Sequence, residues 1–428
     1  MSNLHSQVQE GIFDQEPQVF SSAYNMNTIN TNLTPTAPAS NIKVEDSAPL
    51  ISGENHLLIR NPESKKLVLL FSGTYKNSGR FDFWNVAQNL KSEANVLLLN
   101  NGKNQWYQQG IPDFGNSLAE STNRVKKLAE QLSVTEIYTI GVSMGGFGAT
   151  LFAKALNAKV LAFGIDSLLG IVGSRSKKSM HPSTNVLQRD LIPFLSDSSI
   201  DLTLIVGEMD ILDLYGASRI RNLPGVKTIS IRGMDHGGGR YIDKNFGLAD
   251  FIKRFISGEP FPELYERGTA LESPNLVVGL YRAHCLGLEG DWEKAVSILK
   301  PLTDHNPMSE IAHYSLGLAL LKQKKFAEAR SHFYIVAAMT PYFISGRFYL
   351  AHTLRMEKQY KPALHLFLQQ LKEKPDSAPT LFNAGCIYSA LNETDKAIEL
   401  ISKAVELKPN KKSYSDQLNA IKISSKKK

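Results

Sequence analysis

Short, unbroken runs of apolar residues recur along the first half of the chain, with polar or amphipathic stretches between them. The runs cover residues 67–71, 96–99, 137–140, 160–163, 202–206 and 228–231. Strands that are apolar throughout are typical of a sheet covered on both faces, and hence of a mostly parallel sheet with crossover helices. The clearest helix candidates between the strands are residues 117–131 and 241–255. The pattern therefore predicts a doubly wound α/β domain over residues 51–258.

From about residue 275 the pattern changes to one with a period of 34 residues. Alanine recurs at this spacing, at Ala295, Ala329, Ala363 and Ala397. A large apolar residue follows each alanine by four positions, at Leu299, Phe333, Phe367 and Ile401. Proline also recurs, at Pro307, Pro341, Pro375 and Pro409. These spacings predict helix–turn–helix units in which small residues let two helices approach and a proline ends the second helix.

This periodic part resembles the tetratricopeptide repeat (TPR). The first unit departs from the family pattern, because Ala283 and Leu286 stand where the family has glycine and tyrosine, but terminal repeats are often atypical. After the last proline, an apolar spacing predicts a capping helix that covers the final repeat, with Tyr414, Leu418 and Ile421 on its inner face. The resemblance implies an all-α TPR solenoid of four repeats and a capping helix over residues 275–424.

The remaining segments are polar or broken by proline. Residues 1–50 are rich in Asn, Ser, Thr, Gln and Pro, which predicts a flexible tail. The run Gly258–Pro262 interrupts the α/β pattern, so residues 259–274 are predicted to form a linker. A chain of 428 residues with 42% hydrophobic residues has room for both predicted domains.

Charge and cysteine content narrow the possible compartments and partners. The net charge is +7, but much of the excess lies near the C-terminus, where Lys426–Lys428 are interpreted as a solvated end rather than a site for nucleic acid. Cys285 and Cys386 both fall in helical patterns, which predicts core packing in a reducing compartment rather than disulfides. No signal peptide is visible, and no apolar run is long enough to span a membrane. We therefore expect a cytoplasmic protein.

The sequence Gly141-Val142-Ser143-Met144-Gly145 follows one of the apolar strands and precedes a stretch of small residues that predicts the start of a helix. Gly-x-Ser-x-Gly in that position indicates a sharp turn that exposes the serine hydroxyl. Glycine is needed beside the serine because Cβ atoms there would collide with the neighbouring strand and helix. Ser143 is accordingly the candidate nucleophile.

A nucleophilic serine needs a base and an acid that orients it, and candidates follow in the chain order acid, then histidine. His236 lies after the last predicted strand with glycines on both sides, whereas His181 precedes the good acid candidates. For the acid we favour Asp210, which follows the strand before the histidine in a Gly-x-x-Asp pattern. Asp213 and Asp166 remain alternatives. Glu208 and Asp235 are less favoured, since their positions point the carboxylate away from the histidine.

Residues 56–257 thus resemble the α/β-hydrolase superfamily. The resemblance implies a serine hydrolase with a Ser143–His236–Asp210 triad. It also implies an oxyanion hole formed by the N–H of Met144 and by that of Gly73 or Thr74, in the loop after the first strong strand. Cleavage of an ester, an acyl group on a polar substrate such as a glycan or a modified peptide, is the expected reaction. Acyl transfer by the same triad is one alternative, and a TPR scaffold whose hydrolase domain only binds is another.

Two loops bear on the substrate. Trp106 and Tyr107 lie at the predicted carboxyl edge of the sheet, where they would either stack on a sugar or plug the loop against the domain. Arg175, Lys177 and Lys178 would either meet an anionic substrate or be solvated, and the second interpretation is favoured. No extended apolar lid helix is predicted, which disfavours a lipase of long-chain fats.

The sequence shows no metal-ligand spacing and no phosphate-binding glycine loop, so no cofactor and no metal are expected. TPR repeats usually bind protein segments in the concave groove of the stacked helices. The first helices of the repeats would give that groove a basic character through Arg282, His284, His313, Arg347, Tyr349, His352 and Arg355. We therefore expect a protein or peptide partner that is acidic or ends in a carboxylate.

Overall fold

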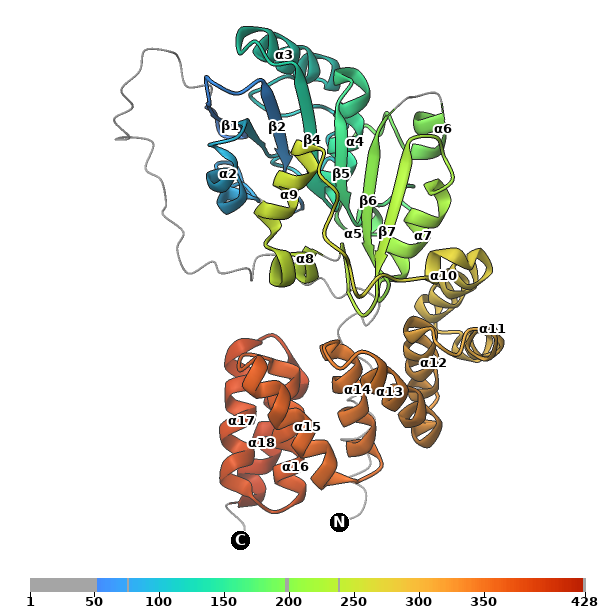
Figure 1. The fold of residues 1–428 in the computed structure, drawn as a ribbon. Coiled ribbons are helices and arrows are strands. Elements are labelled where there is room, and N and C mark those ends of the chain that lie inside the picture. Colours follow the sequence, from blue (N-terminus) through green and yellow to red (C-terminus); the bar gives the residue numbers. More distant parts are fainter. Residues whose placement is uncertain (1–51, 75–76, 197–199, 238, 426–428) are drawn as a thin grey trace. The chain divides into compact units, whose positions relative to one another are not determined.

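The computed structural model describes residues 52–74, 77–196, 200–237 and 239–425 (Figure 1). The predicted flexible tail, residues 1–50, and the terminal Lys426–Lys428 lie outside these residues. The described chain divides into two compact units, one ending at Tyr281 and the next beginning at Arg282. They are called the α/β unit and the helical unit below.

The α/β unit contains a seven-stranded sheet with the order β1-β3-β2-β4-β5-β6-β7. Its strands are β1 (His56–Ile59), β2 (Lys66–Phe71), β3 (Asn95–Leu99), β4 (Glu136–Val142), β5 (Lys159–Phe163), β6 (Leu202–Gly207) and β7 (Val226–Ile231). Neighbouring strands are parallel except for β1, which pairs antiparallel with β3. The apolar runs therefore predicted six of the strands. The edge strand β1 has only four residues, half of them partly exposed, and so lacks the pattern of a buried strand.

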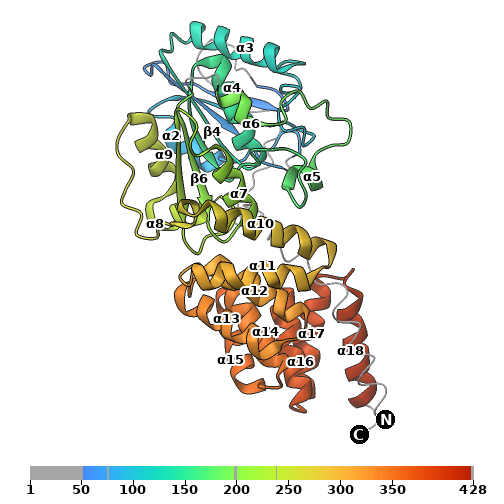
Figure 2. The same ribbon diagram turned by 90° about the vertical axis from the view of Figure 1, so that its right-hand side faces the viewer.

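Helices cover both faces of the sheet, as expected for strands that are apolar throughout. Residues Leu67–Phe71 of β2 are fully buried. The helices of this unit are α2 (Trp84–Leu90), α3 (Leu118–Gln131), α4 (Met144–Leu156), α5 (Arg175–Ser179), α6 (Leu191–Ser196), α7 (Ile211–Ile220), α8 (Gly239–Phe246) and α9 (Leu248–Ser257). Helices α2 and α9 lie on one face, and α3 and α4 lie on the other (Figures 1 and 2). The helix predicted over residues 241–255 is broken at Gly247, whose φ is 72°.

The segment predicted as a linker is part of the α/β unit. Its backbone pairs with β7: the N–H of Arg232 donates to Glu266 O at 2.7 Å and the N–H of Gly268 donates to Ser230 O at 2.8 Å. The short 3₁₀ helix η2 (Ala270–Glu272) follows, and then α10 (Pro274–Glu289). The α/β unit thus extends past the predicted boundary at residue 258.

The helical unit is built from the predicted helix pairs. After α10 come α11 (Trp292–His305), α12 (Glu310–Lys322), α13 (Phe326–Met339), α14 (Ile344–Met356), α15 (Tyr360–Glu373), α16 (Ala378–Ala390), α17 (Thr394–Leu407) and α18 (Lys412–Ser425). The four periodic prolines each follow the end of the second helix of a pair, at α11, α13, α15 and α17.

Small residues of one helix receive large residues of the next, as the period predicts. The periodic alanines and the large apolar residues four positions after them are buried. A Cβ atom on Gly317 would lie 2.9 Å from the Phe333 ring, and one on Gly385 would lie 2.5 Å from Ile401. Larger residues at these two positions would push the paired helices apart. Tyr414, Leu418 and Ile421 of α18, the residues expected on the inner face of the capping helix, are buried in the cluster that also holds Phe382 and Ile401.

Candidate active site

Ser143 lies at the turn between β4 and α4. Its backbone has φ 56° and ψ −121°, a combination that residues with a side chain rarely adopt. Val142 and Met144 on either side of it are buried, whereas Ser143 itself is partly exposed. The sharp strand-to-helix turn expected from the sequence is therefore present, with the serine at its apex.

The glycines around Ser143 are sterically required. A Cβ atom on Gly141 would lie 2.3 Å from the carbonyl carbon of Gly145. One on Gly145 would lie 2.2 Å from Phe71 O, in the neighbouring strand β2. One on Gly146 would lie 2.7 Å from Ile165. These distances are shorter than any real Cβ contact, so the turn can form only with glycine at these positions.

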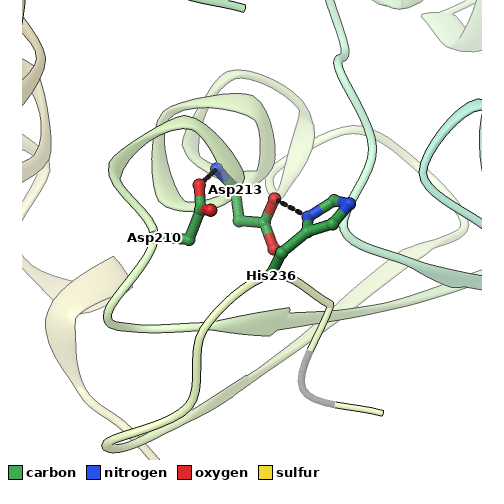
Figure 3. Close-up of side chains that lie close together, drawn as sticks. All are labelled: Asp210, Asp213 and His236. Carbon is green, nitrogen blue, oxygen red and sulfur yellow. Dashed lines mark hydrogen bonds and ion pairs between the residues drawn. The ribbon is translucent and has the colours of Figure 1, made fainter. Parts of the chain in front are cut away.

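His236 lies in the loop after β7 and is hydrogen-bonded to Asp213 of α7 (Figure 3). The distance from Nδ1 of the imidazole to Oδ1 of Asp213 is 2.8 Å. The other carboxylate oxygen accepts the N–H of Gly237 at 2.6 Å. Because an ionised carboxylate only accepts hydrogen bonds, Nδ1 carries the proton, and Nε2 of the neutral ring is then free to accept one. Nε2 is buried, and no hydrogen-bond partner for it occurs among the described residues.

The histidine loop packs against the strand ends that hold the serine. A Cβ atom on Gly237 would lie 3.5 Å from the Val142 side chain and 3.4 Å from Cβ of Phe163. The N–H of Ser143 donates to the carbonyl oxygen of the same Phe163 at 2.8 Å. Ser143 follows β4, Asp213 follows β6 and His236 follows β7, so parallel pairing brings all three to the carboxyl edge of the sheet.

Asp210, the acid favoured from the sequence, does not hold the histidine. It is the N-cap residue of α7, and its Oδ1 accepts the N–H groups of Leu212 and Asp213 at 3.0 Å each. A capping side chain turns back onto its own helix, whereas Asp213 lies in the first turn and faces the histidine loop. The structure therefore corrects the expected partner of His236 from Asp210 to Asp213. The other alternative, Asp166, accepts the N–H of Ser176 at 2.7 Å.

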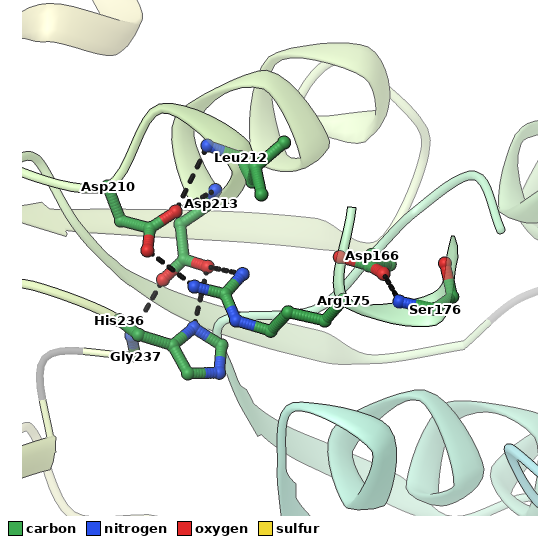
Figure 4. A network of polar contacts seen from close by, with 8 residues as sticks. All are labelled: Asp166, Arg175, Ser176, Asp210, Leu212, Asp213, His236 and Gly237. Atoms are coloured by element: carbon green, nitrogen blue, oxygen red, sulfur yellow. Dashed lines mark hydrogen bonds and ion pairs between the residues drawn. The ribbon is translucent and has the colours of Figure 1, made fainter. Parts of the chain in front are cut away.

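Arg175, whose place in the site sequence reasoning missed, joins the two carboxylates (Figure 4). Its Nη1 lies 3.2 Å from Oδ1 of Asp213, and its Nη2 donates to Oδ2 of Asp210. The side chain is only 15% exposed. Burial by itself raises the pKa of Asp213, but the charges of His236 and Arg175 and the hydrogen bonds outweigh it and hold that pKa below its ordinary value. Asp213 is therefore an anion at neutral pH.

Asp210, Asp213 and His236 also have the composition of a metal site, with one ligand atom each within 4.8 Å of one another. However, Arg175 already forms ion pairs with both carboxylates. A divalent cation at that point would meet a fixed positive charge, so these residues fit a charge-balanced hydrogen-bond network better than a metal centre.

The two candidates for the second oxyanion donor differ in what they contact. The N–H of Gly73 donates to Oδ2 of Asp82 at 2.9 Å, so it is not free for a substrate. This leaves Thr74 as the candidate in that loop. A Cβ atom on Gly73 would lie 3.5 Å from Val142 O, which places the loop beside the serine turn. The first donor, the N–H of Met144, belongs to the first residue of α4, where backbone N–H groups have no partner within the helix.

Trp106 and Tyr107 are not part of a substrate surface. Their exposed fractions are 1% and 0%. The Tyr107 hydroxyl donates to Ser72 O at 2.8 Å, and its ring packs edge-on against Phe71 and Phe152. The expectation that these rings stack on a sugar is therefore wrong, and the alternative, that they plug the loop against the domain, is confirmed.

The predicted basic groove of the repeats is only partly present. His284, His313, Tyr349 and His352 are buried. Arg347 forms a double hydrogen bond to Glu373, at 2.7 and 2.6 Å. Of the residues expected to line the groove, Arg282 is exposed and Arg355 is half-buried. Helix packing uses the histidines as interior residues, which the periodic pattern alone does not reveal.

Comparison with protein families identifies the periodic region. Residues 289–342 and 378–411 each match a model of the tetratricopeptide repeat. The chain carries tetratricopeptide repeats. The matches agree with the helix pairs of the structure and confirm the period found in the sequence. Repeats of this kind act as protein-interaction scaffolds, so a protein partner is indicated for the TPR region.

Some solved structures resemble part of this chain at low sequence identity. MamA from Desulfovibrio magneticus RS-1 is 23% identical over 36% of this chain and 87% of its own, with a TM-score of 0.34. TTC0263, a thermophilic TPR protein of Thermus thermophilus, is 21% identical over 35% of this chain and 82% of its own, with a TM-score of 0.31. These likenesses are too limited to carry any argument about function. No curated protein matches the chain at a significant level.

None of the described helices combines the length and the apolar character that crossing a bilayer requires.

Proposed function

We propose that the α/β unit is a serine hydrolase of the α/β-hydrolase type, with Ser143 as nucleophile, His236 as base and Asp213 as the orienting acid. One observation carries the proposal: a serine in a strained strand-to-helix turn shares a sheet edge with a histidine whose Nδ1 is held by a buried carboxylate and whose Nε2 is unpartnered among the described residues. A strained backbone that persists in a fold is often part of a functional site.

In the proposed reaction, acyl transfer takes the usual two steps. The Ser143 oxygen attacks the ester carbonyl carbon while its proton passes to Nε2 of His236. The ester bond then breaks, and His236 returns the proton to the leaving alcohol. Water attacks the acyl-serine with His236 again as base, which releases the acid and restores Ser143. The N–H groups of Met144 and Thr74 are the proposed donors to the oxyanion.

We propose an ester on a polar substrate, such as an acylated glycan or a modified peptide. The segment between β5 and β6 carries only the short helices α5 and α6 among its described residues, so no long apolar lid of the kind suited to fatty chains is found there. The buried Trp106 and Tyr107 lend this choice no support. The TPR region would bring in the partner or the substrate-bearing protein, through an acidic segment that pairs with Arg282 and Arg355.

Labelling with a fluorophosphonate, which reacts with activated serines, tests the proposal without knowledge of the substrate. We expect the wild-type protein to be labelled at Ser143 and Ser143→Ala to give no signal. Ser183→Ala is a matched control, because Ser183 also bonds a histidine, His181, at 2.7 Å, but does so in an exposed loop without the strained turn. It should be labelled like the wild type. Labelling that persists in folded Ser143→Ala would refute the assignment.

Two other outcomes separate the alternatives. Mass analysis of products with added alcohols or amines distinguishes acyl transfer from hydrolysis, since only a transferase gives the new ester or amide. If the folded wild-type protein is neither labelled nor turns over p-nitrophenyl acetate, the α/β unit is a binding module and the TPR scaffold is the function.

A further inference from the structure

A buried arginine next to a histidine base is electrostatically unusual, because its positive charge opposes protonation of the imidazole. Here the guanidinium of Arg175 and the ring of His236 bond the same atom, Oδ1 of Asp213, at 3.2 and 2.8 Å. Figure 4 shows the guanidinium joined by dashed lines to the carboxylates of Asp210 and Asp213, with the imidazole beside it. The arginine therefore lies within direct electrostatic reach of the base.

We infer that Arg175 is a positioning residue of the proposed reaction, which holds Asp213 against His236 and cancels the negative charge of Asp210. The inference rests on the proposed function. It goes beyond the three triad residues because it gives the five-residue helix α5 and the capping residue of α7 a part in the chemistry.

The backbone around Arg175 is fixed well enough for this role. Ser174 caps α5 by accepting the N–H of Lys177, at 3.1 Å. Ser176, on the other side of Arg175, donates its N–H to the Asp166 carboxylate, and its hydroxyl accepts the N–H of Gly170 at 2.9 Å. These bonds cap α5 at Ser174 and tie Ser176 to the segment after β5, so the side chain of Arg175 projects from an anchored backbone.

The need for a cation follows from the two acids. Asp210 and Asp213 are both buried, and one oxygen of each lies within 4.8 Å of the other. The negative charges of two carboxylates this close repel each other, which disfavours ionisation of both. A protonated Asp213 could no longer accept two hydrogen bonds from His236 and Gly237 at full strength. Arg175 removes this repulsion.

The charge balance also affects the imidazole. Near it are Asp213 and Asp210 from the start of α7 and Arg175 from α5. Asp166 after β5 and Lys178 on α5 interact in turn with Arg175. The ion-paired set of two acids and one arginine has a net charge of −1, which balances one imidazolium. Without Asp210 that set is neutral, and without both Asp210 and Arg175 it is again −1.

The decisive comparison is between Asp210→Asn and the double variant Asp210→Asn/Arg175→Met, which differ only at residue 175. Asparagine keeps the capping oxygen of α7. The readout is the rate of fluorophosphonate labelling against pH, whose acid limb reports deprotonation of the base. We expect the limb of Asp210→Asn to move to lower pH and that of the double variant to lie about one pH unit or more above it. Arg175→Lys should leave the limb in place but lower the plateau rate, because lysine bonds only one acid well.

An arginine that does not act on the base would leave the acid limb of the double variant at the same pH as that of Asp210→Asn, which would overturn the inference. If the double variant does not fold, Arg175→Lys decides: a plateau rate equal to that of the wild type rejects the inference. The proposed function fails separately, when Ser143→Ala is still labelled. If Ser143→Ala is not labelled and the acid limb does not move when residue 175 is changed, only the role of Arg175 is rejected.

Discussion

The backbone of Ser143, with φ 56° and ψ −121°, lies in a region that glycine reaches without cost and that other residues reach only when their surroundings impose it. Here the backbone at Gly141, Gly145 and Gly146 lies so close to neighbouring atoms that no side chain fits, and this tight packing holds the turn between β4 and α4. The fold thus stores strain at the residue that presents its hydroxyl.

This strain predicts a stability difference between two inactive variants. Ser143→Gly and Ser143→Ala both lose the hydroxyl, but only glycine relaxes the backbone, so we expect Ser143→Gly to be more stable by about 1 kcal/mol. Urea unfolding followed by circular dichroism measures the difference. Equal midpoints for the two variants would mean that the turn is unstrained.

Asp213 and Asp210 should also differ in their effects on labelling. Asp213→Asn removes the acceptor that sets the tautomer of His236, and we expect the labelling rate at neutral pH to fall by roughly 10³–10⁴-fold. Asp210→Asn keeps the helix cap and should lower the rate less than tenfold. If the larger loss belongs to Asp210, the assignment of the acid is wrong.

The sequence placed Ser143 at a strand-to-helix turn and His236 in the loop after the last strand, and the structure has both there; their catalytic roles stay predictions. It did not separate Asp210 from Asp213, since that choice depends on which residue begins α7. It gave no sign that Arg175 joins them either. An arginine in a serine- and lysine-rich stretch resembles a solvated loop, and only the fold shows that two acids enclose it.

At the scale of elements, the helix pair α12 and α13 holds a pair of histidines. Nδ1 of His313 lies 2.9 Å from Nδ1 of His332, and Nε2 of His313 donates to Pro307 O at 3.0 Å. One Nδ1 must therefore accept, which requires a neutral ring. Burial, and then the proximity of His313, lower the pKa of His332 below its ordinary value of 6.5.

This pair predicts a pH-dependent stability of the TPR region. A histidine whose pKa is lowered on folding binds protons more weakly when folded, so stability is lost as the pH falls below about 6.5. We expect the melting temperature of His332→Gln to fall less than that of the wild type when the pH is lowered from 7.5 to 5.5. His305→Gln, at an exposed position in α11, is the matched control and should follow the wild type. An equal loss in all three proteins would contradict the prediction.

The apolar pattern predicted the helices and strands correctly where a strand is buried on both faces or where the buried residues recur at a fixed period. The strands from β2 to β7 and the repeat helices belong to this group. The pattern failed where main-chain geometry decides: β1 is too short to show a period, and a positive φ at Gly247 divides one predicted helix into α8 and α9. The prediction that Trp106 and Tyr107 line a substrate site failed for another reason, since aromatic residues in a loop do not reveal whether the loop folds inward.

At the scale of the whole molecule, the end of the α/β unit is set by contacts with no sequence signature. Glu208 is buried, and its Oε1 accepts both the Ser230 hydroxyl at 2.8 Å and the N–H of Ala270 at 2.7 Å. The ring of Tyr281, in α10, stacks on Tyr215 of α7 with centroids 4.0 Å apart. The sequence suggested an end at residue 258 because a helix ends there in glycine and proline, whereas backbone pairing and a single carboxylate carry the unit further.

These contacts predict where the α/β unit can be cut. A fragment of residues 52–290 keeps them, whereas a fragment of residues 52–258 leaves the Glu208 carboxylate without the Ala270 donor and uncovers Tyr215. We expect the shorter fragment to be less stable by about 1–3 kcal/mol from the lost donor alone. Urea titrations of the two fragments measure this, and coincident unfolding curves would show that residues 259–290 are dispensable.

Helix α18 closes the apolar core of the last repeat: Tyr414 stacks on Phe382 at 4.4 Å, while Asp416, Asn419 and Lys422 are exposed on its other side. A stack of similar helical hairpins has no inherent length, because each added hairpin buries one apolar face and exposes another. An amphipathic helix such as α18 stops that growth, because its outer side is polar. Without α18 the apolar side of the last repeat would be exposed to solvent, and we expect the molecules to associate through it.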